Sequence, residues 1–144
     1  MKTCCFLGYG QLPLGEDYVR LYISVAGHIN ALIKRGVTDF ISCGLPGLDS
    51  LAAHAVLNLR RINSIRLLLY LPYERYNRYV NKQANQIKYT LKDARHCRYE
   101  MIDASDFCIC CLGTAAAGDV TEEIRYAESK GVEVIVIKVK DTII

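Results

Sequence analysis

Three short apolar runs constrain the fold of this 144-residue chain more than any other feature of its sequence. They read IRLLLYL at positions 65–71, DFCICCLG at 106–113 and VEVIVIKV at 132–139. Each run has the length of a strand and is too apolar for either face of that strand to lie in water. Strands of this kind belong to parallel sheets that helices cover on both sides. The runs therefore predict an α/β fold with a buried, mostly parallel sheet.

Strand-like and helix-like segments alternate along the rest of the chain. Two further strands and three helices are expected, the strands at 2–7 and 39–43 and the helices at 16–34, 48–60 and 119–130. Residues 75–91, polar and rich in tyrosine, indicate a further helix whose thin apolar side consists of Tyr76, Tyr79, Val80 and Ile87. We therefore expect one Rossmann-like domain over residues 1–144, with three α/β/α layers around about five strands.

Composition narrows the class of protein. The net charge of +3 is mild and neither demands nor excludes an anionic partner. No stretch reaches the roughly 18 apolar residues of a membrane span, and the first residues do not resemble a signal peptide, so we expect a cytoplasmic protein without membrane contact. The seven cysteines are odd in number and mostly lie in predicted strands. We expect buried, reduced thiols that act as small apolar residues, and no metal site; we also expect no cofactor.

Three glycine-bearing turns each follow a predicted strand. They are Gly8-Tyr9-Gly10, CGLPGLD at 43–49 and LGTAAAGD at 112–119. The carboxyl ends of parallel strands meet at one edge of the sheet, where ligands of such folds bind. Glycine lets backbone amides approach an anion, and a helix that begins there adds further N–H donors. The turns therefore predict a site for a phosphate or carboxylate, although ordinary turn chemistry also uses glycine and proline.

The residues expected at this site fall into two groups. The first two turns would form one wall, in which Asp49 either caps the following helix or accepts a hydrogen bond from a sugar hydroxyl. The expected residues of that wall are Gly8, Tyr9, Gly10, Gly44, Leu45, Gly47 and Asp49. The expected residues of the opposite wall are Arg98, Gly113, Thr114, Gly118, Asp119, Thr121 and Glu122.

Several segments resemble, in the same order, proteins of the SLOG superfamily. They are CCFLGYG, FISCGLPGLDSLAAHAVL, LPYERY, RYEMIDASDFCICCLG and GDVTEEIRYAESKGVEVIVI, which together span nearly the whole chain. The superfamily joins the LOG phosphoribohydrolases with the single-strand DNA-binding protein DprA, and this chain is most similar to its small YpsA-like branch. The resemblance implies a Rossmann-like fold and a pocket for a nucleotide, a nucleotide derivative or a nucleic-acid phosphate. We expect a role in sensing or regulation rather than turnover.

The same resemblance implies an enzymatic alternative. LOG hydrolases carry a turn written GGxGTxxE. At 116–123 this chain has Gly118 and the final Glu123, but Asp119 stands at a glycine of that pattern, where it would repel a phosphate. A shifted register would use Gly113 and Thr114 instead. The LOG arginine position falls on Cys97, with Arg98 beside it. If the protein is a nucleoside 5′-monophosphate phosphoribohydrolase, the catalytic residues would be Glu123, or its neighbour Glu122, and Arg98. Acidic residues at a helix start also have a purely structural explanation.

The sequence is compatible with two kinds of macromolecular partner, a nucleic acid and a second copy of the chain. Basic residues interleaved with tyrosines between positions 60 and 99 are compatible with DprA-like binding of single-stranded nucleic acid, and equally with a solvated helix face. The apolar helix faces exceed what a five-stranded sheet can cover, which favours a homodimer. Homodimers are also usual among LOG-like proteins.

Overall fold

The computed structural model describes residues 2–8, 12, 15–43, 47–71, 82–90, 94–112 and 117–138, with the backbone alone at 94, 95, 112 and 117–120. Its strands form one six-stranded sheet in the order β4-β3-β2-β1-β5-β6, and every neighbouring pair is parallel. The strands are β1 (Lys2–Gly8), β2 (Val37–Ser42), β3 (Arg66–Leu71), β4 (Gln86–Tyr89), β5 (Phe107–Leu112) and β6 (Glu133–Lys138). The predicted Rossmann-like α/β fold is confirmed.

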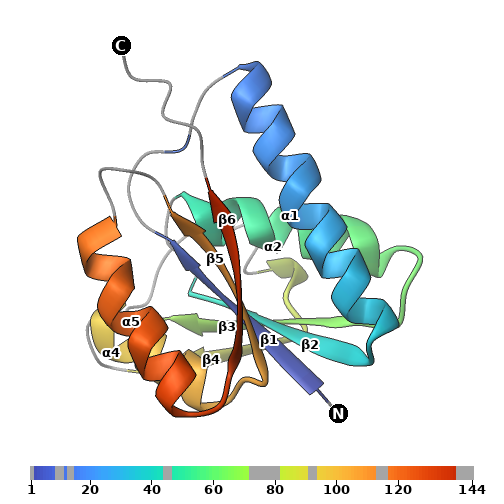
Figure 1. Ribbon diagram of the computed structural model, residues 1–144. Helices are drawn as coiled ribbons and strands as arrows, with labels where there is room; N and C mark the ends of the chain where they lie inside the picture. Colours follow the sequence, from blue (N-terminus) through green and yellow to red (C-terminus); the bar gives the residue numbers. More distant parts are fainter. Residues whose placement is uncertain are drawn as a thin grey trace.

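Four helices of the described ranges cover the two faces of this sheet. They are α1 (Glu16–Lys34), α2 (Leu48–Arg60), α4 (Ala94–Asp103) and α5 (Ala117–Ser129). Figure 1 shows α1 and α2 on one side of the sheet and α4 and α5 on the other. The chain therefore has the three layers that continuous apolar strands require. None of these helices is both long and apolar enough to cross a membrane.

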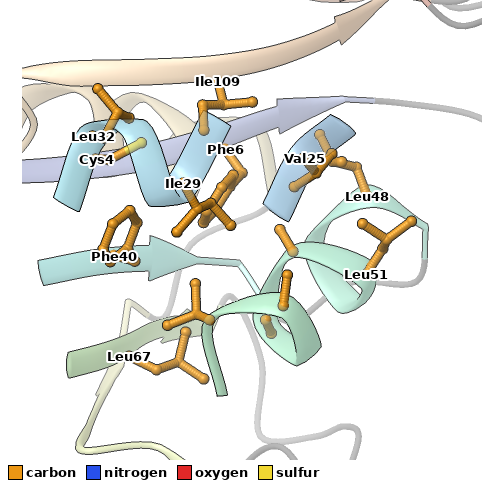
Figure 2. Close-up of a cluster of buried hydrophobic side chains, with 14 of the residues drawn as sticks. Cys4, Phe6, Val25, Ile29, Leu32, Phe40, Leu48, Leu51, Leu67 and Ile109 are labelled. Carbon is orange, nitrogen blue, oxygen red and sulfur yellow. The ribbon is translucent and has the colours of Figure 1, made fainter. Parts of the chain in front are cut away.

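The larger core lies between the sheet and helices α1 and α2. Side chains alternate along β1, so Cys4 and Phe6 face this core and the intervening Cys5 faces the opposite side. Phe6 stacks on Phe40 of β2 with 6.3 Å between ring centroids. Figure 2 shows Val25, Ile29 and Leu32 of α1 directed into this core, with Ile29 beside Phe6. This is the packing that the three- and four-residue steps of α1 predict.

All seven cysteines are buried free thiols, as expected. Cys4 and Cys111 lie in the core under α1 and α2; those under α4 and α5 are Cys5, Cys43, Cys97, Cys108 and Cys110. Burial raises the pKa of Cys110 and that of Cys111 to about 12. Both thiols therefore stay protonated and behave as small apolar side chains. Within the described ranges, no cluster of three or more His, Cys, Asp and Glu residues suits a metal ion.

The prediction of a helix over residues 75–91 is wrong at its C-terminal end. Residues 86–89 form β4, a sixth strand beyond the expected five, while 75–81 lie outside the described residues. Asn85 fixes the start of this strand through two hydrogen bonds to Leu67. The side-chain oxygen of Asn85 accepts from the backbone N–H of Leu67 at 2.9 Å, and the backbone N–H of Asn85 donates to the Leu67 carbonyl. Pairing with the open edge of β3 outweighs a weak helical pattern, because an edge strand needs no continuous apolar run.

Helix α4 was not expected from the sequence. Cys97 and Met101, four residues apart, are fully buried against the sheet, and Ile102 joins them. Tyr99 of α4 meets Tyr126 of α5 edge to face, with ring centroids 4.6 Å apart. These contacts fix α4 beside α5 and thereby set the position of Arg98, the residue next to Cys97.

Candidate functional site

The strand order reverses at β1. From β1 the chain moves outward through β2, β3 and β4, and it then returns to the other side of β1 to form β5 and β6. In open parallel sheets the crevice at such a reversal, beyond the carboxyl ends of the strands, is the usual ligand site. Helix α2 begins directly after the turn that follows β2, and α5 begins after β5, so both helices start at this edge.

Gly8 ends β1 at the reversal point and packs against the first residue of α2. A Cβ atom added to Gly8 would lie 2.6 Å from Cδ2 of Leu48 and 3.0 Å from its Cβ. The missing side chain therefore allows the start of α2 to lie against the end of β1. Close packing of helix on strand is a sufficient physical reason for this glycine, whichever ligand the edge accepts.

Gly47 and Asp49 build the start of α2. Gly47 has a φ of 95°, a conformation that favours glycine, and it occupies the N-cap position without any side-chain cap. Asp49 does not cap the helix. Its carboxylate turns back and accepts a hydrogen bond from the Cys43 amide at 3.3 Å, while its carbonyl accepts from the Ser42 hydroxyl at 2.9 Å. Asp49 therefore ties the end of β2 to the start of α2.

The carboxyl group of Asp49 is buried, and this changes its titration. Burial, together with the nearby charge of Glu123, raises the pKa of Asp49 to about 7, against the lowering effect of the Cys43 hydrogen bond. Near neutral pH this carboxyl group is therefore divided between its protonated and ionised forms. It is a proton-exchanging group at the edge where the sequence predicts a ligand.

Arg98 of α4 and Glu123 of α5 form an ion pair at the same edge. Nε of Arg98 lies 3.3 Å from Oε1 of Glu123, and the two side chains are only 5% and 2% exposed. Glu123 also contributes to raising the pKa of Cys110 in β5 and of Cys43 after β2. Its charge therefore acts on groups from both sides of the strand reversal. Burying two charges costs free energy that their mutual attraction only partly offsets. The presence of an ion pair here therefore requires an explanation.

Cys97 completes this cluster from α4. Its thiol donates to the Tyr70 carbonyl at 2.9 Å, and its sulfur lies 3.4 Å from that of Cys43. We call Asp49, Arg98 and Glu123, with Cys43 and Cys97, the edge cluster. Its charged members were predicted from the sequence, whereas the contact between the two thiols was not. The four-residue spacing of Cys97 and Met101 was the available signal for the helix that makes it.

The other predicted site residues are placed unevenly. Glu122 is exposed and Thr121 half-buried, so among the two glutamates it is Glu123 that belongs to the edge cluster. Gly118 and Asp119 lie in the first turn of α5, where the backbone alone is described. The remaining predicted residues lie outside the described part of the chain: Tyr9, Gly10, Gly44, Leu45, Gly113 and Thr114.

Several of the basic residues considered for nucleic acid bind other parts of the chain. Arg66 forms two hydrogen bonds to Asp39 of the neighbouring strand, at 3.0 and 2.8 Å. Arg60 donates to the Gln83 carbonyl and to the Asn85 side chain. Nζ of Lys88 lies 3.8 Å from Oε2 of Glu100 in α4. These cations have structural roles, which leaves less positive charge for a phosphate backbone over 60–71 and 82–90.

Comparison with known proteins bears on the fold. No protein-family model and no curated protein matches the chain. Among solved structures, the X-ray structure of TM1055, a Northeast Structural Genomics Consortium target, is similar with a TM-score of 0.67. The similarity covers 93% of this chain and 72% of that one, at 18% sequence identity. At that identity the comparison supports the Rossmann-like fold and leaves the function to the chemistry of the site.

Proposed function

We propose that this protein binds a nucleotide or a nucleotide-derived ligand at the carboxyl edge of its sheet, as a sensing or regulatory protein of the SLOG type. The anionic group of the ligand would bind the N-terminal amides of α2 and α5, where the helix dipoles favour negative charge. The ribose hydroxyls would then face the edge cluster. The motif resemblance of the whole chain to SLOG proteins motivates this class of ligand.

One observation carries the proposal: three charged side chains from three helices are buried together beside the strand reversal. Asp49, Arg98 and Glu123 are each at most 5% exposed. A core of apolar side chains would be no less stable than such an arrangement, since burying charges costs free energy that their attraction only partly returns. Ionisable groups that are kept in this way at a ligand edge are typical of functional sites.

A thermal-shift screen with nucleoside monophosphates, diphosphates and cyclic nucleotides tests this proposal. A ligand at about 100 times its dissociation constant adds about 2.7 kcal/mol to the free energy of unfolding. For a chain of this size we expect the melting temperature to rise by roughly 5 to 11 °C. Inorganic phosphate and free nucleosides serve as controls, because the proposal requires the combined ligand to stabilise more than either part.

Three outcomes of the screen have different meanings. A saturable shift with one class of nucleotide supports the proposal. A shift only with a single-stranded DNA oligonucleotide, lost as salt is added, would support DprA-like nucleic-acid binding instead. If every nucleotide leaves the melting temperature unchanged at millimolar concentration, the proposed function is wrong.

The pairing of Arg98 with Glu123 favours one second candidate, a phosphoribohydrolase. In that reaction water attacks C1′ of the ribose, the bond to the base nitrogen breaks, and the base takes a proton and leaves beside ribose 5-phosphate. The Glu123 carboxylate would stabilise the oxocarbenium-like transition state or orient the water, and Arg98 would hold that carboxylate in place. We rank binding first, because Asp119 lies where the LOG turn binds phosphate.

Release of free base from nucleoside monophosphates decides between the two candidates. If the protein is a hydrolase, Glu123→Gln abolishes release while Glu122→Gln, a matched change at the exposed neighbour, keeps it. Both variants must show wild-type circular dichroism for this comparison to hold. Wild-type protein that releases no base above the buffer rate eliminates the hydrolase and leaves the binding proposal unaffected.

A further inference from the structure

The outward face of α1 is apolar at its centre. Val19 and Ile23 are 54% and 63% exposed, and Gly27 and Ala31 follow them at four-residue steps on the same line. A Cβ atom added to Gly27 would meet nothing within 4 Å. We call these four residues the outer stripe of α1. A helix face directed to water normally carries polar residues, so the outer stripe indicates a surface that is covered in the functional state.

The outer stripe lies opposite the part of α1 that packs on the sheet. The buried residues of the helix are Leu21, Val25, Ile29 and Leu32. With 3.6 residues per turn, these four positions point away from the outer stripe. In Figure 1 α1 forms the outer boundary of its layer, with the sheet and α2 on its inner side. The outer stripe is therefore a second apolar face of α1, separate from the face that packs in the core.

The order of side-chain sizes along the outer stripe makes it complementary to itself. The two bulky residues, Val19 and Ile23, lie in the N-terminal half of α1, and the two small residues, Gly27 and Ala31, lie in the C-terminal half. The helix runs from Glu16 to Lys34, so its midpoint is position 25. In an antiparallel pair of α1 helices centred there, Val19 meets Ala31 of a second copy and Ile23 meets Gly27 of a second copy. Bulky side chains then fill the space that small ones leave.

The charges of α1 favour the same orientation. Its first turn holds the acidic residues Glu16 and Asp17, and its last turn holds the basic residue Lys34. Antiparallel pairing about position 25 sets Glu16 beside Lys34 of the second copy at both ends of the interface, whereas parallel pairing would set like charges together. Arg20 already contacts both acids, at 3.7 and 3.4 Å, and stays available to share them. Exposed charges of this kind select orientation more than they add affinity.

From these observations we infer that a second copy of this chain binds the outer stripe of α1, and that the two copies form a two-fold symmetric, antiparallel helix pair. Such an interface is isologous: each copy offers the same surface. A contact through one helix is small, so the dimer forms in a concentration-dependent way. The outer stripe belongs to the α1 and α2 layer, whereas Arg98 and Glu123 belong to the opposite layer. The dimer and the ligand proposal therefore stand or fall separately.

Sedimentation velocity over a concentration series tests the interface. We expect wild-type protein to move from monomer toward dimer mass as its concentration rises. Ile23→Asp puts a charge into the centre of the pair and should keep the protein monomeric throughout. Ile62→Asp is the matched control: Ile62 is 82% exposed but follows α2, and its replacement should leave the dimer unchanged.

Two further variants separate the interface from effects on folding. Gly27→Leu fills the space reserved for Ile23 of the second copy and should block dimerisation while the melting temperature of the monomer is kept or raised. Glu16→Lys and Lys34→Glu should each weaken the dimer, and the double variant should restore it. A wild-type protein that stays monomeric at every concentration overturns the proposal, as does a dimer that survives both Ile23→Asp and Gly27→Leu.

Discussion

Replacing Glu123 by leucine lowers the free energy of unfolding by about 3 to 5 kcal/mol, and replacing Arg98 by methionine does the same, because either change leaves a buried charge without its partner. Removing both charges together behaves differently. The double variant Arg98→Met/Glu123→Leu puts apolar side chains of similar volume between α4 and α5, and we expect it to recover most of the lost stability. Urea denaturation of the four proteins measures all three effects in one cycle.

The matched control for this cycle is the Arg35–Glu133 pair. Those two side chains join α1 to β6 through hydrogen bonds of 2.9 and 3.1 Å, but they are about half exposed. Water and salt screen such a pair, so its single replacements should cost far less than those of the buried pair. A cycle in which Glu123→Leu and Glu133→Leu cost the same would show that the Arg98–Glu123 pair is not held in a dry environment.

The second large effect concerns the pH dependence of stability. Asp49 has a pKa of about 7 in the folded protein, against about 3.9 in an unfolded chain. The folded state therefore binds more protons between these two values, and the free energy of unfolding falls as the pH rises from about 4 to 7. The total change is on the order of a few kcal/mol. Asp49→Asn keeps an acceptor for the Cys43 amide but carries no charge, so it should remove the fall.

Asp39 supplies an internal control with the opposite sign. The hydrogen bonds from Arg66 lower the pKa of Asp39, so its contribution to stability is present above about pH 4 and is lost as the pH falls below that value. Asp39→Asn should therefore change the acidic limb of the stability curve and leave the region between pH 4 and 7 unaltered. If Asp49→Asn leaves the slope between pH 4 and 7 intact, another group is responsible for it.

The strands that could be predicted from the sequence are those whose residues are apolar on both faces of the strand. A run such as IRLLLYL is apolar on both sides and is typical of a strand covered by helices, so β3, β5 and β6 could be predicted as strands. The place of β6 at the edge of the sheet, with Val136 45% exposed, could not be predicted in the same way. The edge strand β4 has no such pattern, because Gln86, Lys88 and Tyr89 are exposed and Ile87 is the residue of this strand that packs on the core. Pairing with β3 holds the strand in place. Its existence depends on a tertiary contact that local sequence does not encode.

The candidate site shows the same division. The resemblance to SLOG motifs predicted that Arg98 and Glu123 belong to the site. The helical repeat of α5 puts Glu123 on the same side as the buried Ala127, four residues later, and it leaves Glu122 in solvent. That phase was readable in advance. The burial of Arg98 was not, because it depends on α4 packing beside α5 through Tyr99 and Tyr126. Sequence predicted which side chains matter, and packing between distant segments determined their electrostatic state.

Calorimetric titration of a nucleotide into wild-type protein and into the Arg98→Met/Glu123→Leu variant tests the central claim most directly. The claim is that the charges of the edge cluster are kept for a ligand and not for stability. We predict saturable binding to wild-type protein and no measurable binding to the double variant, although that variant remains folded and nearly as stable. Equal affinity of the two proteins for the nucleotide would contradict the claim, since the buried charges would then have no part in recognising it.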